Sequence, residues 1–345
     1  MSRTSPTGLA RSRLTPLHVT GIDAWSSLCS TAYVPLATVA DPGFRGSMHE
    51  TTAGVASISQ VGSTAATIQR GRPQVRADPR EALILSIFLT GGGTVLQSPQ
   101  PAAVRAGAGY LLESDRPYSV RFAGRYDMLA LRLPAARTGL DRRELGALTG
   151  RPIGAAVPEL AVLRGHLAQL VDEPPAPAEE ATEQAVLGEL LGALGHRMLH
   201  PDRPQPRLSG AALVTHARWY LQRHHTDPDF GIDDAARAYG VSRRHLEAAF
   251  ARRGQGRGPG PGAHLRTVRM RRASQLLAAD RDLTVAAAAR RAGFGDVNTF
   301  IRAFRRQWHT TPDSWRRGRS AVAPLRRDDD RLLTDLGRLT WARAS

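Results

Sequence analysis

Short alternating apolar stretches dominate the chain from Met48 to about Pro134, where β-branched residues recur between turn-forming residues. The alternation of ATIQ at 66–69 predicts a half-buried strand, and the unbroken apolar run ALILSIFLT at 82–90 predicts a fully buried one. We count seven or eight such strands with no long helix between them. This arrangement predicts a β-sandwich or a small barrel.

The pattern becomes helical after Pro158. The stretches 160–171 and 181–199 each repeat leucine or valine every three or four residues, which predicts two amphipathic helices. A segment rich in Pro and Glu separates them. These helices either pack back on the β domain or pair between two subunits, and the sequence leaves both alternatives open.

The remaining segments define the expected domain organisation. Residues 1–40 are rich in Pro, Ser, Thr and Arg with little periodicity, which indicates a loosely ordered lead-in. Several prolines in 200–209 indicate a linker, and the tail 319–345 contains RLLTDLGRLTW, which favours a short amphipathic helix. We therefore expect an α+β protein with a β-rich domain over 41–199 and an all-helical domain over 210–318.

A repeat within the helical domain predicts two helix-turn-helix motifs, at 232–253 and 285–308. IDDAARAYGVSRRHLEAAFARR and VAAAARRAGFGDVNTFIRAFRR each begin with a β-branched residue, contain an Ala pair and reach a glycine eight positions later. Small residues allow the two helices of a motif to cross closely, and glycine tolerates the left-handed turn between them. The predicted core residues are Ala236, Gly240, Val241, Leu246 and Phe250 in the first motif, and Ala289, Gly293, Phe294, Phe300 and Phe304 in the second.

The segment between the motifs predicts a rigid connecting helix. In 263–277, leucine and valine share one face while arginines crowd the others. Two recognition helices that enter successive major grooves lie about 34 Å apart, and a rigid helix can hold that distance.

Positive charge is concentrated in the helical domain. The formal net charge is +16 and all 47 basic residues are arginine. From Arg207 to Arg319 there are 22 arginines and 9 acidic residues, a net charge of +13. Such a concentration favours a polyanionic partner, although a generally arginine-rich proteome is an alternative explanation.

Residues 210–318 resemble the DNA-binding domain of the AraC/XylS family of transcription regulators. The motif LTVAAAARRAGFGDVNTFIRAFRRQWHTTPDSWR at 283–316 carries the GF, F-x-R-x-F-R and P-x-x-W-R features of that family, and GVSRRHLEAAF matches the first unit. The β-rich half resembles the family's cupin-like regulatory domain in DPGFRG, AGAGYLLESDRPYSVRF and MLALRLP. The Gly- and Pro-rich segment 254–262 is longer than the corresponding family loop, which puts equal engagement of DNA by both motifs in doubt.

The resemblance implies positions for the DNA contacts. The residues expected to face bases are Arg243, Arg244, Glu247, Ala248, Asp296, Val297, Asn298 and Arg302. The arginines expected to neutralise phosphates are Arg252, Arg253, Arg305 and Arg306. Arginine pairs with guanine, asparagine with adenine, and glutamate accepts from cytosine. Asp296 has an alternative role as a helix cap.

The resemblance also implies the partners. We expect a cytoplasmic transcription activator that binds double-stranded promoter or operator DNA, RNA polymerase and a small-molecule effector, with homodimerisation through 160–199 as a hypothesis. Leu83, Leu85 and Phe88, with Tyr110 or Tyr118, are candidates to line an effector pocket, although core packing explains them as well or better. No cofactor is expected.

Two other classes of function are weighed. The first is a nucleic-acid-binding protein without an effector, and the second is a degenerate cupin enzyme. His49 is the only histidine between Val19 and Gly165, and no H-x-H pair exists. Cys29 is the single cysteine. The sequence therefore argues against a metal enzyme. No apolar stretch is long enough to span a membrane.

Overall fold

The chain divides into two compact units, with the boundary between Pro206 and Arg207. The computed structural model describes residues 16–203, 207–253, 258–280 and 282–318. Part of the predicted linker, 204–206, and the whole predicted tail, 319–345, lie outside the described residues.

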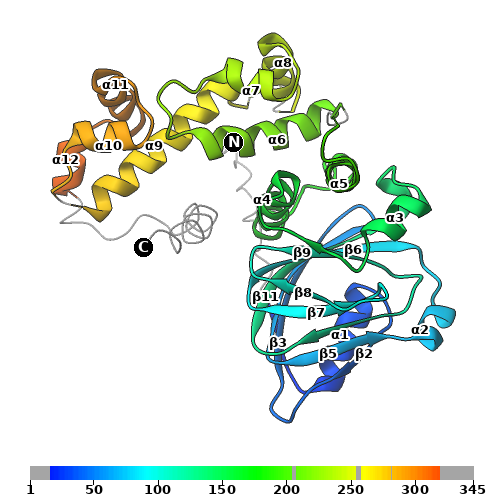
Figure 1. The fold of residues 1–345 in the computed structure, drawn as a ribbon. Helices are drawn as coiled ribbons and strands as arrows, with labels where there is room; N and C mark the ends of the chain where they lie inside the picture. The colour runs from blue at the N-terminus through cyan, green and yellow to red at the C-terminus, as the bar shows by residue number, and fades with distance from the viewer. Residues whose placement is uncertain (1–15, 204–206, 254–257, 281, 319–345) are drawn as a thin grey trace, which may run out of the picture. The chain divides into compact units, whose positions relative to one another are not determined.

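Two antiparallel sheets enclose the core of the first unit (Figure 1). The seven-stranded sheet has the order β1 (Leu17–Thr20), β3 (Arg45–Ala53), β4 (Ala56–Ser63), β11 (Tyr126–Pro134), β6 (Ala82–Thr90), β9 (Gly109–Glu113) and β12 (Pro152–Ile153). The five-stranded sheet has the order β2 (Ala37–Val39), β5 (Ala66–Arg70), β10 (Tyr118–Phe122), β7 (Gly92–Leu96) and β8 (Ala102–Arg105). The predicted fold class is confirmed in its sandwich form, because these sheets do not close into one barrel within the described residues.

Strand β6 shows why the apolar run at 82–90 is continuous. Ile84 and Phe88 belong to the aromatic core between the sheets. Leu83 and Leu85 are also fully buried, at 0% exposure. Successive side chains of a strand point to opposite faces, so these leucines lie on the outer face of the sheet, which helices cover.

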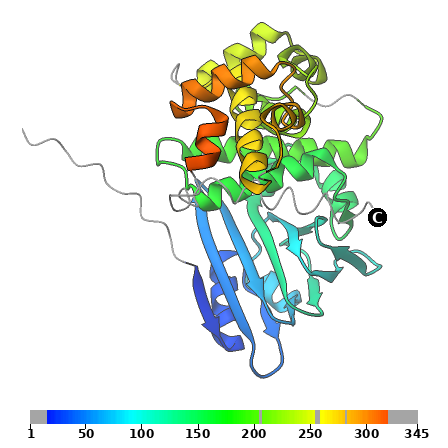
Figure 2. The same ribbon diagram turned by 90° about the vertical axis from the view of Figure 1, so that its left-hand side faces the viewer.

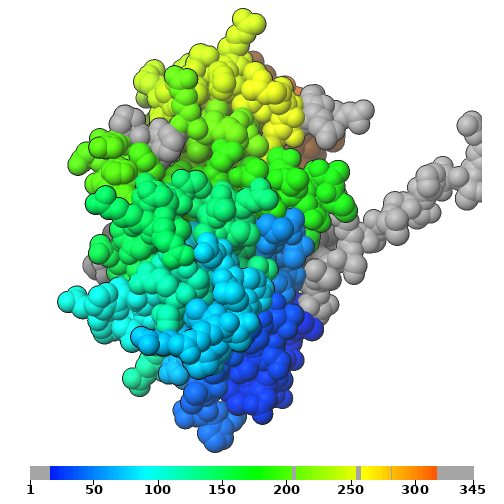
Figure 3. All heavy atoms as spheres, turned by 90° about the vertical axis from the view of Figure 1, so that its right-hand side faces the viewer, coloured from blue at the N-terminus to red at the C-terminus, as the bar shows by residue number. Residues whose placement is uncertain are grey.

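The prediction of a loosely ordered segment over residues 1–40 is wrong for the described part of it. Residues 16–40 contain strands β1 and β2 with helix α1 (Ile22–Ala32) between them. Trp25, Cys29 and Ala32 of α1 are buried in the sandwich core, and Trp25 is only 1% exposed. Figure 3 shows the blue N-terminal atoms packed against the lighter blue atoms of later strands. Several of the Ser and Thr residues that suggested irregular structure lie on α1 between these buried residues.

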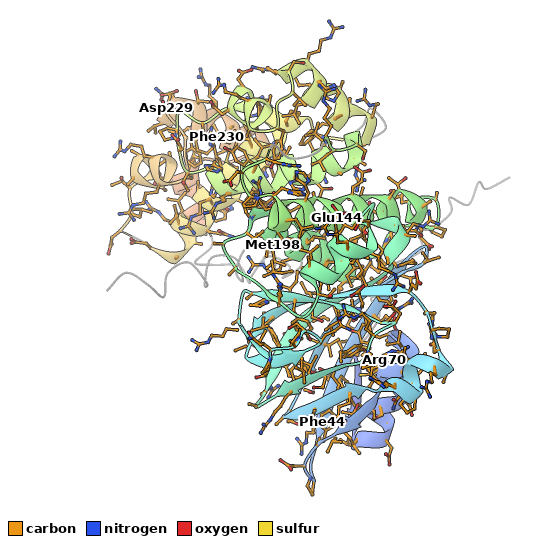
Figure 4. All side chains as sticks on the ribbon, turned by 45° about the vertical axis from the view of Figure 1, so that its right-hand side comes forward. Phe44, Arg70, Glu144, Met198, Asp229 and Phe230 are labelled. Carbon is orange, nitrogen blue, oxygen red and sulfur yellow. The ribbon has the colours of Figure 1, made fainter. Side chains whose placement is uncertain are left out.

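A buried arginine secures this N-terminal segment to three other parts of the unit. Arg70, labelled in Figure 4, is 0% exposed. Its guanidinium donates hydrogen bonds to the carbonyl oxygens of Pro35 (2.6 Å), Ser114 (2.7 Å) and Asp78. Desolvation lowers the pKa of Arg70, and the three carbonyl oxygens stabilise the positive charge of its buried guanidinium.

Helices α4 (Pro158–Asp172) and α5 (Glu180–Leu199) cover the seven-stranded sheet. Helix α4 packs on strands β3, β4 and β11, and α5 packs on α4 and β3. The backbone N–H groups of Gly54 and Val55, at the tip of the β3–β4 hairpin, donate to Glu180 and Gln184 of α5. The leucines that suggested pairing between subunits are buried within this unit: Leu160, Leu163, Leu167 and Leu170 in α4, and Leu187, Leu190, Leu191 and Leu194 in α5. Of the two alternatives, the structure shows packing on the parent domain.

Three short elements complete the first unit. They are α2 (Arg72–Ala77), the 3-10 turn η1 (Ala135–Arg137) and α3 (Arg142–Leu148). Asp141 caps α3 by accepting the backbone N–H of Glu144 at 2.8 Å.

The second unit is entirely helical in its described residues. Its helices are α6 (Gly210–His224), α7 (Ile232–Ala238), α8 (Arg243–Arg253), α9 (Pro261–Ala279), α10 (Val285–Arg291), α11 (Val297–Trp308) and α12 (Pro312–Gly318). Leu265 of α9 joins a core made with α6, α7 and α8, whereas Leu277 joins a second core made with α10 and α11. Helix α9 therefore connects two small cores (Figure 2). The long insertion at 254–262 lies partly outside the described residues, and α9 begins within it at Pro261.

Candidate nucleic-acid interface

The first helix-turn-helix consists of α7 and α8 joined by a tight turn. Gly240 has a φ of 61°, in the left-handed region that glycine enters at no steric cost. The backbone N–H of Val241 donates to the carbonyl of Ala236 at 3.0 Å and closes the turn. Leu246 and Phe250, at 0% and 2% exposure, attach α8 to the core beneath it.

The second helix-turn-helix consists of α10 and α11. Gly293 occupies the turn with a φ of 86°. The carboxylate of Asp296 accepts the backbone N–H groups of Asn298 (3.2 Å) and Thr299 (2.8 Å), together with the Thr299 hydroxyl. These hydrogen bonds, led by that of the Thr299 hydroxyl, lower the pKa of Asp296. Asp296 therefore has its alternative role as the N-cap of α11.

Aromatic rings anchor α11. The ring centroids of Phe294 and Phe300 lie 5.1 Å apart, and those of Phe300 and Phe304 lie 5.5 Å apart. Trp308 and Trp315 extend the cluster from Phe304. Tilted and edge-on aromatic pairs of this kind contribute more than their buried area alone.

The structure places the predicted core residues on the inner sides of the two motifs. The buried members are Ala236, Leu246, Phe250, Ala289, Gly293, Phe294, Phe300 and Phe304. Val241 is half-buried and Gly240 is exposed at its turn.

The predicted DNA-facing residues lie on the solvent sides of α8 and α11. Of those expected to face bases, the exposed ones are Arg243, Arg244, Glu247, Asp296, Asn298 and Arg302, and the half-buried ones are Ala248 and Val297. Of those expected to face phosphates, Arg252, Arg305 and Arg306 are exposed and Arg253 is half-buried. Each recognition helix thus has a polar face opposite its buried stripe.

The polar face of α8 contains a network of ion pairs. Arg243 Nε lies 2.9 Å from Glu247, and its Nη1 lies 3.2 Å from Asp233 of α7. These partners, Glu247 first, raise the pKa of Arg243. The spacing of four residues could have indicated the Glu247 pair in the sequence, but nothing could have indicated Asp233, which is ten positions away across the turn.

The polar face of α11 differs from that of α8. Arg302 donates to the Thr299 hydroxyl at 3.2 Å. In the part of the chain that the structure describes, no acidic side chain forms an ion pair with Arg302, Arg305 or Arg306. These three cations are exposed to solvent and available to an anion.

Arg269, one of the arginines of the connecting helix α9, has a structural role. It donates three hydrogen bonds to backbone carbonyls of the loop between α6 and α7. Because its partners are main-chain atoms, no side-chain pattern could have indicated them.

One buried histidine, His216, and one half-buried histidine, His264, lie near the first motif. Burial lowers the pKa of His216 and of His264 to about 4, and nearby Arg218 and Arg271 also lower that of His264. Both imidazoles are therefore neutral at pH 7.

The candidate effector-pocket residues fall on two sides of one sheet. Phe88, Tyr110 and Tyr118 belong to the core between the sheets, whereas Leu83 and Leu85 lie on the outer face. These five residues therefore do not line a common pocket. Within the described ranges, no group of three or more His, Cys, Asp or Glu side chains is arranged to hold a metal ion. Within the same ranges, no helix has the length and apolar character needed to cross a membrane.

Family models match most of the chain. A model of the AraC-binding-like domain matches residues 25–200, and a model of a helix-turn-helix domain matches residues 235–318. A search of curated proteins finds no match.

Solved structures with similarity to the chain include two transcription regulators and the protein ToxT. The AraC-like transcriptional activator CuxR is 14% identical over 76% of this chain and 96% of its own, with a TM-score of 0.46. A probable AraC family transcriptional regulator from Rhodopseudomonas palustris CGA009 is 28% identical over 30% of this chain and 94% of its own, with a TM-score of 0.27. ToxT from Vibrio cholerae O395 is 10% identical over 81% of this chain and 99% of its own, with a TM-score of 0.27.

Proposed function

The chain belongs to the AraC family of transcription regulators, and from this premise we propose that it binds a bipartite operator through α8 and α11. The observation that carries the proposal is the shared design of the two motifs: each has a buried apolar stripe and an opposite, solvent-exposed polar stripe. A B-DNA major groove admits one helix of this kind. Two such helices on one rigid domain fit two successive grooves.

Within this proposal, Arg302 and Asn298 contact base edges from α11, and Arg244 contacts them from α8. Arg305 and Arg306 neutralise phosphates beside α11, as do Arg252 and Arg253 beside α8. Phosphate contacts position a protein on DNA, whereas base contacts determine the sequence it selects.

A binding selection from random duplexes, made with the full chain, tests this function. We expect a motif with two elements about one helical turn apart. Arg302→Ala should relax one position of that motif and weaken binding to it by about 1–3 kcal/mol. Arg76→Ala, which removes the same charge from exposed α2 in the other unit, is the matched control and should leave the motif unchanged. Binding without any motif that simply fades with salt would contradict the proposal.

The AraC-binding-like domain supports a further part of the proposal, that the first unit binds a small-molecule effector and thereby controls transcription. We propose that the regulator is an activator that contacts RNA polymerase and binds its operator as a homodimer. In-vitro transcription from a selected operator, with and without the protein, distinguishes activation from repression. Sedimentation of the full chain at micromolar concentration measures the oligomeric state.

A further inference from the structure

We propose that Arg269 determines the spacing between the two DNA elements that the protein accepts, by holding the two helix-turn-helix motifs in one relative orientation. The inference rests on the proposed function, because it concerns how the two recognition helices meet one operator. Arg269 acts here as a positioning residue and does not itself contact DNA.

Arg269 lies near the middle of α9 and binds the loop that leads into the first motif. Its Nε donates to the carbonyl of His225 (2.8 Å), and its Nη2 donates to those of Asp227 (2.6 Å) and Phe230 (2.9 Å). Figure 4 labels Asp229 and Phe230 in this loop, between α6 and α7. Desolvation lowers the pKa of the half-buried guanidinium, which remains charged at neutral pH.

The turn of the second motif lies against the same loop. A Cβ atom added to Gly293 would lie 1.8 Å from the carbonyl oxygen of His225 and 2.9 Å from Nε of Arg269. A Cβ added to Gly295 would lie 3.9 Å from Pro228. The carbonyl of His225 is therefore the point where the loop before α7, the connecting helix and the turn before α11 meet.

This junction removes the freedom that a single connecting helix would leave. Helix α9 fixes the distance between the two cores, but side-chain packing at its two ends still allows each core to rotate about it. A planar guanidinium that donates to three carbonyls in a fixed fork defines that rotation. Two recognition helices can enter successive grooves only at one combination of distance and rotation.

Arg269→Lys tests the proposal, because an ammonium group retains the charge but cannot reproduce the fork. Arg266→Lys, at an exposed position one turn earlier on α9, is the matched control. The full-length proteins are each used in the selection from random duplexes. We expect the wild type and Arg266→Lys to select one spacing. We expect Arg269→Lys to select the same two elements over several spacings, with affinity for the wild-type spacing lower by about 10-fold or more.

A distance measurement in the free protein separates this proposal from the proposed function. Spin labels on exposed cysteines introduced at His245 in α8 and Gln307 in α11 report the separation of the two recognition helices. The wild type should give one narrow distance distribution, and Arg269→Lys a broad one. Pro228→Gly, which loosens the loop and leaves α9 intact, should broaden it in the same direction and serves if Arg269→Lys does not fold.

The outcomes are distinguishable. A wild type that selects no two-element motif would refute the proposed function, whatever the labels report. A two-element motif with an unchanged spacing in Arg269→Lys, together with an unchanged distance distribution, would overturn only the role of Arg269. Loss of binding to duplexes that carry a single element would also overturn it, because positioning should leave each motif's own contacts intact.

Discussion

The two helix-turn-helix motifs share one sequence pattern but are supported by different surroundings. The turn at Gly240 is open: apart from its two chain neighbours, no described residue has an atom within 4 Å of the position that a Cβ would take. The turn at Gly293 is closed by the carbonyl of His225. Gly240 therefore serves one purpose, which is to permit a left-handed turn. Gly293 serves two, because it also allows close contact with a neighbouring loop.

The two recognition helices differ in charge as well. Arg243 of α8 already has acidic partners in Asp233 and Glu247, so binding to DNA would require exchange of those partners. Arg302, Arg305 and Arg306 of α11 form no ion pair with an acidic side chain of the described residues, although Asp296 attracts Arg302 at longer range. Under the proposed function, the three arginines of α11 are therefore expected to bind DNA without first breaking an ion pair, unlike Arg243 of α8.

Acidification should give the largest difference in stability between the two motifs. His216 and His264 lie in the first half of the domain with a pKa near 4, below the unfolded value of about 6.5, whereas the described part of the second half contains only the exposed His309. The unfolded chain binds these protons first, so stability present above pH 6.5 is lost as the pH falls toward 4, on the order of 3 kcal/mol for each histidine.

Hydrogen exchange of the full chain between pH 7 and pH 4.5 measures this effect. Amides of α6 and α8 should lose protection before those of α10 and α11. His216→Gln should weaken the dependence on pH, and His309→Gln should leave it unchanged. Equal loss of protection in both motifs would contradict the attribution of the pH dependence to His216 and His264.

Matched glycine substitutions should give the next largest difference. Gly240→Ala forces a left-handed alanine into open space, which costs about 1–2 kcal/mol. Gly293→Ala has the same backbone cost and also pushes the loop at His225 away, which adds roughly 1–3 kcal/mol. Chemical denaturation of both variants measures the difference between their free energies of unfolding. Equal destabilisation would show that the loop yields freely and would also weaken the case for a rigid junction.

The helix caps should give the smallest difference. Ser242 accepts one backbone N–H, that of His245 at 3.1 Å, so Ser242→Ala should cost about 1 kcal/mol. Asp296 accepts two backbone N–H groups and a hydroxyl, so Asp296→Ala should lower the melting temperature further than Ser242→Ala. Thermal unfolding followed by circular dichroism ranks the two variants. The reverse order would mean that the cap matters less than the aromatic anchor of α11.

Patterns that depend on side-chain periodicity could be predicted from the sequence. Strand β6 coincides with the apolar run at 82–90, and α10 and α11 together span the range 285–308 in which the second motif was expected. Each of these elements buries one or both faces, so its apolar residues recur with the period of the element.

Features that depend on backbone partners or distant segments could not be predicted. The hydrogen bonds of Arg269 end on main-chain carbonyls, which every residue has. The pair between Arg243 and Asp233 depends on the angle between two helices. Helix α1 was missed because its buried stripe of Trp25, Cys29 and Ala32 is narrow, and polar residues of low helix propensity separate its members.

The strand order of the sandwich has a consequence for how the protein is made. Strand β11 lies between β4 and β6 at the centre of the larger sheet, although it is the last of the three to be synthesised. Until residue 134 has left the ribosome, β4 and β6 have no shared neighbour, and the apolar run at 82–90 exposes an unpaired edge. The hydrogen bond from Arg70 to the carbonyl oxygen of Ser114 likewise cannot form until Ser114 has been synthesised. The centre of the larger sheet therefore cannot be completed until β11 has been synthesised, and until then the nascent chain carries an apolar strand with an unpaired edge.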